Sequence, residues 1–400
     1  VLHPLAGKSL IDRVLSCTQG LNPNRRLIVV GHQANVVEAS LKNHQNLDFV
    51  LQKPQNGTGH AIQQLIPKLT GFKGELLVLN GDVPLLQKKT LSSLIKFHKE
   101  SNASVTFLSA SLESPTGYGR VFTNESGLVK GIIEERDCTN EQRKNKLINA
   151  GIYCFNWQQL SDVLNSLSSQ NSQNEIYLTD TISLLTKALH FEVDDPLEVK
   201  GINDRYQLSE CEHYIQEKLK AFWMSKGVSF IDPISCSLSE DSSFGTDVII
   251  EPQTHLRGKC NIGNRCHLGP STVITNSTLA ENVLAIHSFI NEAKIGNNTS
   301  IGPFSHIRPE SDIRENAKIG NFVEIKKSLI GEETKINHLS YVGDSTLGKN
   351  INIGAGTITA NFDGKNKHRT IIDDYSKTGA NSVLVAPIKI GSYVTIGAGS

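Results

Sequence analysis

The 400-residue chain has no net charge, no long apolar run and no CxxC pair. Forty basic residues balance forty acidic ones, which argues against a nucleic-acid-binding surface spread over the whole molecule and leaves open only a local basic patch. No apolar stretch approaches the roughly 18 residues that a bilayer span needs, and no secretory signal is visible at the start. We therefore expect neither nucleic acid nor a membrane as a partner.

The seven cysteines have an odd count and a scattered spacing. This pattern is typical of free thiols in a reducing cytoplasm and not of a disulfide framework. We expect a cytoplasmic protein without structural disulfides.

The second half of the chain repeats an aliphatic residue at every sixth position. Six fits neither the 3.6-residue period of a helix nor a two-faced strand, and it is typical of a hexapeptide β-helix. Three hexads make one triangular coil, and stacked coils bury a continuous aliphatic column. Such columns often carry acyltransferase sites between neighbouring subunits. The positions are Ile295, Ile301, Ile307, Ile313, Ile319 and Ile325, then Ile330, Ile336, Val342, Leu347 and Ile353, then Ile372, Thr378, Leu384, Ile390 and Ile396.

The first half alternates strand and helix patterns, which predicts an α/β domain with a mostly parallel sheet and helices on both faces. Ligands of such sheets bind at the carboxyl ends of the strands. A long helix over 203–226, ended by Gly227, then connects the two halves. We expect a Rossmann-like domain at 1–202, a linker helix at 203–227 and a β-helix domain at 228–400. The expected strands are 26–31, 75–82, 104–110, 131–135 and 147–155, and the expected helices are 9–18, 34–42, 59–65 and 88–99.

Three spots in the first half look like parts of a nucleotide-sugar site. The segment 52–61 follows an apolar run and opens a helix, so Thr58 could cap that helix and Gln52 could read a base, or the segment could be an ordinary glycine-rich turn. Asp82 follows an apolar strand and is our metal candidate, with a turn-capping aspartate as the alternative. Glu134 and Asn149 could bind sugar hydroxyls or could be structural.

One polar run, NFDGKNKHR at 361–369, interrupts the later hexads. Its residues cannot enter an aliphatic core, so they must loop outward. Loops ejected from a rigid scaffold often carry function.

Seven motifs, taken in order, closely resemble one family. They are VLHPLAGK at 1–8, GTGHA at 57–61, NGDVP at 80–84, TGYGR at 116–120, NFVEIKK at 321–327, HLSYVGD at 338–344 and NIGAGT at 352–357. The family is the bacterial bifunctional N-acetylglucosamine-1-phosphate uridyltransferase / glucosamine-1-phosphate N-acetyltransferase. The resemblance covers the whole chain, and the second-half motifs are highly specific.

The resemblance implies two reactions that supply precursors of peptidoglycan and lipopolysaccharide. The β-helix would move acetyl from acetyl-CoA to glucosamine 1-phosphate. The first domain would then join N-acetylglucosamine 1-phosphate to UTP with Mg²⁺, releasing pyrophosphate and UDP-N-acetylglucosamine. The resemblance also implies a homotrimer with acetyl-transfer sites between subunits, and a left-handed β-helix.

Matching the family's motifs residue by residue implies two binding sites. The uridine nucleotide and sugar would be bound by Gln52, Gly57, Thr58, Asn80, Gly81, Asp82, Gly119, Glu134, Asn149 and Asn203, with Asp82 and Asn203 as Mg²⁺ ligands. The acetyltransferase sugar phosphate would be bound by Arg308, Lys326, Tyr341 and Asn352, and acetyl-CoA by Ala355, Asn361, Phe362, Ala380 and Ala398. Asn80, Phe362 and Ala380 depart from residues found in other members, which should tune binding and not abolish it.

His338 is our candidate for the catalytic base. A primary amine must lose a proton as it attacks a thioester, and a neutral imidazole suits that role near pH 7. By position alone, His338 could equally be a solvated corner residue of the solenoid. Lys367 and Arg369 on the polar loop could add charge for CoA or sugar phosphates.

Two other readings remain open at this stage. The chain could be a monofunctional sugar-phosphate nucleotidyltransferase with a regulatory or oligomerising β-helix, or a non-catalytic scaffold. His338, Lys326 and the 361–369 loop discriminate, because neither alternative needs them. The family's glycine-rich phosphate loop would precede Val1 and its C-terminal arm would follow Ser400, so residues 1–400 alone are expected to be weak in uridylyl transfer and reduced in acetyl transfer.

Overall fold

The computed structural model describes residues 1–400, and the chain divides into two compact units, Val1–Cys211 and Glu212–Ser400. Helix α7 (Arg205–Met224) runs across this boundary. No helix combines the length and the apolar character that a membrane span requires. All seven cysteines are free thiols and buried.

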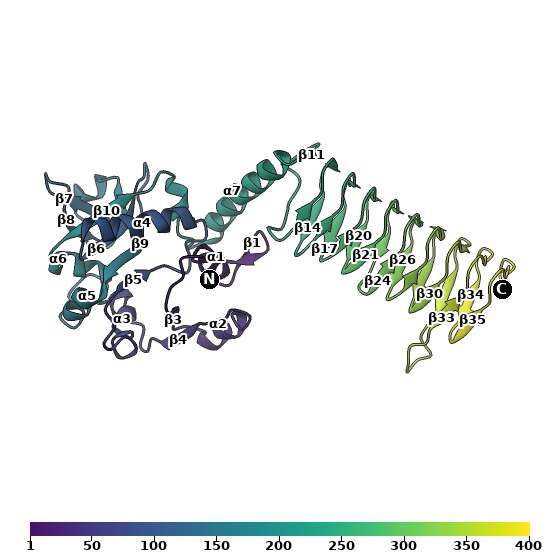
Figure 1. The fold of residues 1–400 in the computed structure, drawn as a ribbon, viewed down its shortest axis with the longest axis horizontal. Coiled ribbons are helices and arrows are strands. Elements are labelled where there is room, and N and C mark those ends of the chain that lie inside the picture. The colour runs from purple at the N-terminus through teal and green to yellow at the C-terminus, as the bar shows by residue number, and fades with distance from the viewer. The chain divides into compact units, whose positions relative to one another are not determined.

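A mixed six-stranded sheet forms the centre of the first unit (Figure 1). Its order is β10-β6-β9-β7-β8, and β5 also pairs with β9. Strand β9 runs antiparallel to β5, β6 and β7, whereas β10 runs parallel to β6. The bounds are β5 Glu75–Val78, β6 Val105–Ser111, β7 Arg120–Thr123, β8 Val129–Ile133, β9 Leu147–Asn156 and β10 Ala188–Glu192.

The expectation of a mostly parallel sheet is therefore wrong for this sheet. Strands β7 and β8 form an antiparallel hairpin, and β9 runs antiparallel to β7. The short turns η2 (Glu135–Asp137) and η3 (Gln142–Lys144) lie between β8 and β9. A parallel connection needs a crossover of a dozen or more residues, and only residues 124–128 join β7 to β8, so these two strands are antiparallel. The remaining short strands are β1 Pro4–Leu5, β2 Lys8–Ser9, β3 Leu27–Val30 and β4 Asp48–Leu51, of which β3 and β4 are parallel.

The predicted helices all form, with ends shifted by a few residues. Ser9 caps α1, because its hydroxyl accepts the Asp12 N–H at 3.1 Å. Helix α4 ends at Asn102, which adopts a left-handed conformation with φ 52°. The bounds are α1 Leu10–Cys17, α2 Ala34–Ser40, α3 Thr58–Gln63, α4 Lys88–Ser101, α5 Trp157–Leu164 and α6 Thr181–Leu184, with 3₁₀ turns η1 Ile66–Lys68, η4 Leu178–Asp180 and η5 Pro196–Val199.

The second unit is a solenoid of short parallel strands in three sheets of eight, nine and eight strands. Figure 1 shows the strands of successive coils side by side along it. This confirms the β-helix that the six-residue period predicts. The first sheet contains β11 Val228–Phe230, β13 Val248–Ile250, β16 His267–Leu268, β19 Leu284–Ala285, β22 Ser300–Ile301, β25 Lys318–Asn321, β28 Lys335–His338 and β31 Asn352–Ile353.

The other two sheets complete each triangular coil. The second contains β12 Ser243–Phe244, β15 Asn261–Ile262, β18 Thr278–Leu279, β21 Ala293–Ile295, β24 Ser311–Ile313, β27 Leu329–Ile330, β30 Ser345–Leu347, β33 Thr370–Ile372 and β35 Ile388–Ile390. The third contains β14 His255–Arg257, β17 Val273–Thr275, β20 Phe289–Asn291, β23 His306–Ile307, β26 Glu324–Lys326, β29 Tyr341–Gly343, β32 Ile358–Ala360 and β34 Val383–Val385.

The repeated aliphatic residues form one continuous core inside the solenoid. Ile319 pairs in register with Ile336, which pairs with Ile353 one coil further on, and the side chains are nearly or fully buried. Full burial of each such side chain stabilises the fold by about 1.5–3 kcal/mol. The column makes the solenoid a rigid support for the side chains that point outward.

Candidate active sites

The carboxyl end of β5 carries Asn80 and Asp82. The Asn80 amide lies against Gly151 of β9, where an added Cβ would be 2.3 Å from Nδ2. The Asp82 carbonyl accepts the Ile202 N–H at 3.0 Å, which brings the segment leading to Asn203 beside Asp82. Burial raises the pKa of the Asp82 carboxyl. The structure thus gathers Asn80, Asp82 and the Asn203 segment at one edge of the sheet.

Gly119, Glu134 and Asn149 form a second group. The Asn149 N–H donates to the Gly119 carbonyl at 2.9 Å, and its side-chain amide donates to the Tyr153 hydroxyl at 2.6 Å. A Cβ at Gly119 would be 3.3 Å from Glu134 Oε2. The Gly151 N–H donates to Asn149 Oδ1 at 3.1 Å, so this group adjoins Asn80 through Gly151.

Gln52, Gly57 and Thr58 are joined around the start of α3. The Gln52 amide donates to the Gly57 carbonyl at 2.9 Å. Gly57 has φ 104°, and a Cβ there would be 2.6 Å from the Ile176 carbonyl oxygen, so this position requires glycine. The prediction that Thr58 caps the helix is wrong: Gly57 occupies the cap position, and the Thr58 hydroxyl accepts the Leu178 N–H at 3.0 Å.

Sequence reasoning missed two residues of this region. The Thr179 hydroxyl donates to Glu134 Oε1 at 2.9 Å, and the Tyr118 hydroxyl accepts the Gly201 N–H at 3.3 Å. Tyr118 stands inside a glycine-rich turn that the sequence does single out. No local sequence pattern marks Thr179, because its partner Glu134 is 45 residues away in the sequence and the two meet only in the folded chain.

Glu134 provides a pH-dependent test of this arrangement. Burial raises the pKa of Glu134, so the folded protein holds this proton to higher pH than the unfolded chain does. Stability is then lost as pH rises from the unfolded pKa of about 4.3 through the folded pKa. We expect Glu134→Gln, which cannot ionise, to raise the thermal midpoint of the first unit at pH 8 and to match wild type near pH 4. Circular dichroism melts at both pH values measure this, and a difference independent of pH would contradict it.

His338 lies at a corner of the solenoid, at the end of β28. Its Nδ1 is 3.0 Å from Asn321 Oδ1 on the preceding coil, and its carbonyl accepts the Gly356 N–H at 3.3 Å. Ala355, Ala380 and Ala398 continue the same corner: Asn381 N–H donates to the Ala355 carbonyl at 2.7 Å, and Gly399 N–H to the Ala380 carbonyl at 2.8 Å. An exposed imidazole therefore adjoins a column of small residues.

The adjoining face of the solenoid carries a group of cations. Arg308 pairs with Glu324 at 2.7 Å, and the Glu324 carboxylate raises the pKa of the Arg308 guanidinium. Tyr341 follows Glu324 in register on the next coil. Lys326, in the same strand as Glu324, lies beside Lys367, and this neighbour lowers the pKa of the Lys367 amine. Arg308, Lys326 and Lys367 thus offer positive charge on one face.

The 361–369 segment leaves the solenoid as a loop, as predicted, and Figure 1 shows it projecting near β33. Asn361 is buried at its base and donates to Asp344 Oδ2 at 2.5 Å, whereas Phe362 is 60% exposed. Asp363 pairs with His368 at 2.6 Å across the loop.

Asn352 is exposed on β31, where it pairs with Lys335 of the preceding coil. It therefore lies on a different sheet of the solenoid from Arg308 and Lys326.

The acetyltransferase candidates therefore fall into two groups, one around His338 and one around Arg308 and Lys326. The sequence did not identify their partners Asn321 and Glu324. Asn321 lies one coil before His338, 17 residues earlier, and Glu324 lies one coil after Arg308, 16 residues later. Because coil length varies, this spacing points to the neighbouring coil but does not fix the residue.

Comparison with known proteins identifies both halves. A family model described as Nucleotidyl transferase matches residues 2–198, and one described as Bacterial transferase hexapeptide (six repeats) matches residues 292–327. A "Bifunctional protein GlmU" of Prochlorococcus marinus (strain NATL2A) is 89% identical over 400 residues, which span all of this chain and 90% of that protein. Proteins of the same name from Synechococcus sp. (strain RCC307) and Prochlorococcus marinus (strain MIT 9313) are 59% and 60% identical over the whole chain and 89% and 90% of their own lengths. The chain therefore belongs to the GlmU family of bifunctional uridyltransferases and acetyltransferases.

Proposed function

We propose that the His338 corner and the adjoining cationic face form the acetyl-transfer site, and that the carboxyl end of β5 forms the uridylyl-transfer site. As a GlmU protein, the chain makes UDP-N-acetylglucosamine by acetylating glucosamine 1-phosphate and then coupling the product to UTP. The observation that carries the site assignment is the Asn321–His338 hydrogen bond beside the column of Ala355, Ala380 and Ala398.

Asn321 sets the protonation geometry of His338. Its amide oxygen accepts from Nδ1–H, so the neutral imidazole keeps its free lone pair on Nε2. Nε2 then takes the proton from the sugar amine as the nitrogen attacks the thioester carbonyl, and the imidazolium returns that proton to the CoA sulfur as the carbon–sulfur bond breaks. Holding amine and thioester together lowers the barrier further, because the attack becomes effectively unimolecular.

The cationic face suits the phosphate of glucosamine 1-phosphate. Arg308 can present its guanidinium to two phosphate oxygens, and Glu324 holds that side chain in place. The neighbouring ammonium groups of Lys326 and Lys367 repel each other, and an anion between them relieves that repulsion. The small side chains at Ala355, Ala380 and Ala398 leave room for acetyl-CoA along the corner, and Tyr341, Asn352, Asn361 and Phe362 border these regions.

Asp82 and Asn203 fit a Mg²⁺ ion. Mg²⁺ prefers carboxylate and other hard oxygen ligands, and burial disfavours the Asp82 carboxylate unless a cation is near. When bound, Mg²⁺ neutralises phosphate charge during displacement at the nucleotide. Glu134 and Asn149 would bind sugar hydroxyls, and Gln52, Gly57, Thr58, Asn80, Gly81 and Gly119 would contact the nucleotide and sugar through side-chain and backbone groups.

Two assays on one protein sample test whether uridylyl transfer and acetyl transfer use separate sites. Asp82→Asn should lower pyrophosphate release from UTP and N-acetylglucosamine 1-phosphate by about 10–100-fold. Thiol release from acetyl-CoA and glucosamine 1-phosphate should stay at the wild-type rate. Equal loss in both assays, or loss in neither, would contradict the assignment of Asp82 to a separate uridylyl-transfer site.

The proposal includes a homotrimer. One solenoid corner exposes a ladder of His287, Phe304, Phe322 and Leu339, in which Phe304 and Phe322 stack at 5.4 Å and Leu339 is 63% exposed. Exposed apolar patches of this kind mark protein–protein contacts, and this ladder adjoins His338, so a second copy would complete the cleft. Analytical ultracentrifugation tests the trimer, and a monomer mass would overturn it.

The domain limits and the location of the protein are also proposals. We assign uridylyl transfer to 1–202, the connecting helix to 203–227 and acetyl transfer to 228–400, which agrees with a matched nucleotidyl transferase model over 2–198. A cytoplasmic location is supported by seven free cysteines. Fractionation of cells with an antibody to the protein tests it.

A further inference from the structure

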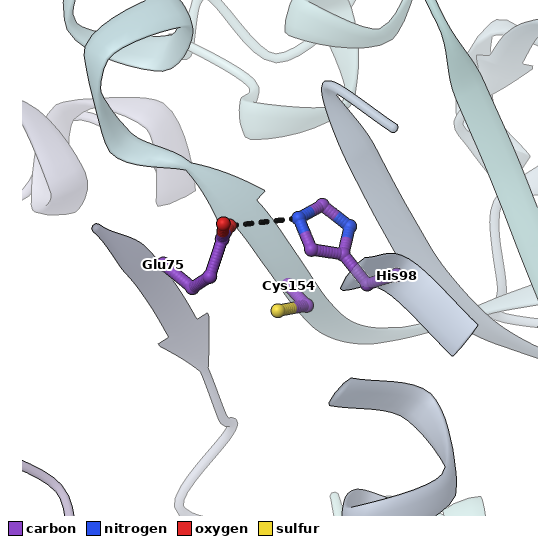
Figure 2. Close-up of side chains that lie close together, drawn as sticks. All are labelled: Glu75, His98 and Cys154. Carbon is purple, nitrogen blue, oxygen red and sulfur yellow. Dashed lines mark hydrogen bonds and ion pairs between the residues drawn. The ribbon is translucent and has the colours of Figure 1, made fainter. Parts of the chain in front are cut away.

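Glu75, His98 and Cys154 form a cluster that neither reaction uses. Glu75 begins β5, whereas Asp82 lies beyond the other end of that strand. His98 comes from α4, and Cys154 lies in β9 opposite Leu77 of β5 and Thr106 of β6. Figure 2 shows the three side chains pointing toward one another between the helix and the sheet.

The cluster is buried at its base and open on one side. Cys154 is fully buried, and the side chains of His98 and Glu75 are 1% and 30% exposed. Their ligand atoms all lie within 4.8 Å of one another. Ligand atoms around a tetrahedral zinc ion are roughly 3.5 Å apart, whereas Glu75 Oε2 lies 2.8 Å from His98 Nε2, so the Glu75 carboxylate must turn away from that nitrogen by under about 1 Å to admit an ion. Its partial exposure leaves that side chain free to do so and gives an ion a path in.

His98 has one ring nitrogen beside the candidate ion position and the other beside a neighbouring oxygen. Nε2 points at Glu75 Oε2 at 2.8 Å, while Nδ1 is 2.9 Å from the Thr106 hydroxyl. Metal-bound histidines use one ring nitrogen for the ion and donate from the other to a neighbouring oxygen, which fixes the ring. Without an ion, Nε2–H donates to the Glu75 carboxylate and Nδ1 accepts from the Thr106 hydroxyl. When an ion takes Nε2, the ring proton moves to Nδ1, and Thr106 is placed to accept that hydrogen bond.

The three ligand types select the class of ion. Thiolate and imidazole favour zinc and similar thiophilic ions, whereas Mg²⁺ prefers oxygen ligands only. Burial raises the pKa of the Cys154 thiol to about 12, so the free thiol is a poor nucleophile. A bound divalent ion displaces the thiol proton to solvent and compensates the buried charge.

We propose that Glu75, His98 and Cys154 bind one thiophilic divalent cation such as Zn²⁺ through a carboxylate oxygen, Nε2 and Sγ, with the fourth position open to water. The ion links α4 to strands β5 and β9 and so stabilises the first unit. This site is distinct from the Mg²⁺ position at Asp82, and it does not depend on the assignment of either reaction.

Cobalt titration of the metal-free protein in Mg²⁺ buffer tests the site. We expect saturation at one equivalent of Co²⁺ per chain, with a thiolate-to-cobalt charge-transfer band in the near ultraviolet that Zn²⁺ abolishes. Cys154→Ser should lose the band. Cys17→Ser should keep it, because Cys17 is a buried thiol of the same unit that bonds only to the Val14 carbonyl. Absence of the band in wild type, or its survival in Cys154→Ser, would overturn the proposal.

A second variant guards against misfolding of Cys154→Ser. Glu75→Gln changes a partly exposed side chain at the start of a strand, and circular dichroism should show an unchanged fold. We expect Co²⁺ affinity to fall by about 10–100-fold with the band retained. Unchanged affinity would remove Glu75 from the ligand set and overturn the three-ligand site.

Discussion

We expect His338→Ala to lower the rate of acetyl transfer by about 10²–10⁴-fold, the usual contribution of a positioned general base. The imidazole is exposed at the corner, and Asn321 holds Nδ1 at 3.0 Å so that Nε2 is free to accept the amine proton. Alanine removes the base without disturbing the buried column beneath it. Thiol release from acetyl-CoA in the presence of glucosamine 1-phosphate measures the effect.

Three controls separate a catalytic role from a structural one. Pyrophosphate release by His338→Ala should equal wild type, and its mass in the ultracentrifuge should not change. Asn321→Ala should lower acetyl transfer by a smaller factor, about 10-fold, because the base remains but loses its orienting partner. If His338→Ala kept most of its acetyl-transfer rate, His338 would not be the base.

Gly320→Ala is expected to destabilise the solenoid by about 3 kcal/mol or more, the upper end of the range for overpacking. A Cβ at Gly320 would be 2.0 Å from the Asn337 carbonyl oxygen and 2.7 Å from its carbon. These atoms belong to the backbone of the next coil, which is held in place by the hydrogen-bonded pairing of Ile319 with Ile336. Moving either backbone to make room for the Cβ would therefore break that pairing. Denaturant unfolding followed by circular dichroism measures the change.

Gly131→Ala is the control. Gly131 lies in β8 of the first unit, outside the left-handed region, and a Cβ there would meet no atom within 4 Å. Its stability should stay within about 0.5 kcal/mol of wild type, as for other substitutions that create no close contact. Equal effects of the two variants would show that loss of glycine flexibility, and not the close approach of coils, is responsible.

The amino-acid sequence predicted the β-helix because its signal is local. Each aliphatic residue faces inward as a consequence of a six-residue period, so Ile295 to Ile325 can be placed without knowing any distant contact. The outward loop at 361–369 was predicted for the same reason, since a run without aliphatic residues at that spacing cannot fill the core. The motifs that mark the family are also short and contiguous.

The six-residue period could not predict which residues lie beside the acetyltransferase candidates on adjacent coils, because the coils differ in length. Successive coils differ in length, with separations of 16, 18 and 17 residues from Leu284 through Ser300 and Lys318 to Lys335. The neighbour above or below a given side chain therefore cannot be fixed by counting. The pairing of Asn321 with His338 and of Glu324 with Arg308 became known only from the register of the strands.

The first unit shows the larger gap between sequence and structure. Sequence patterns located Asp82, Glu134 and most helices, since capping and strand ends are local properties. They failed for the sheet, which was expected to be mostly parallel and is mixed, because strand direction depends on how β9 returns across the sheet. They also failed for Thr179 beside Glu134 and for the Glu75, His98 and Cys154 cluster. Those contacts join residues that are between 23 (Glu75 to His98) and 79 (Glu75 to Cys154, 154 − 75) positions apart, so only the packing of the tertiary structure decides them.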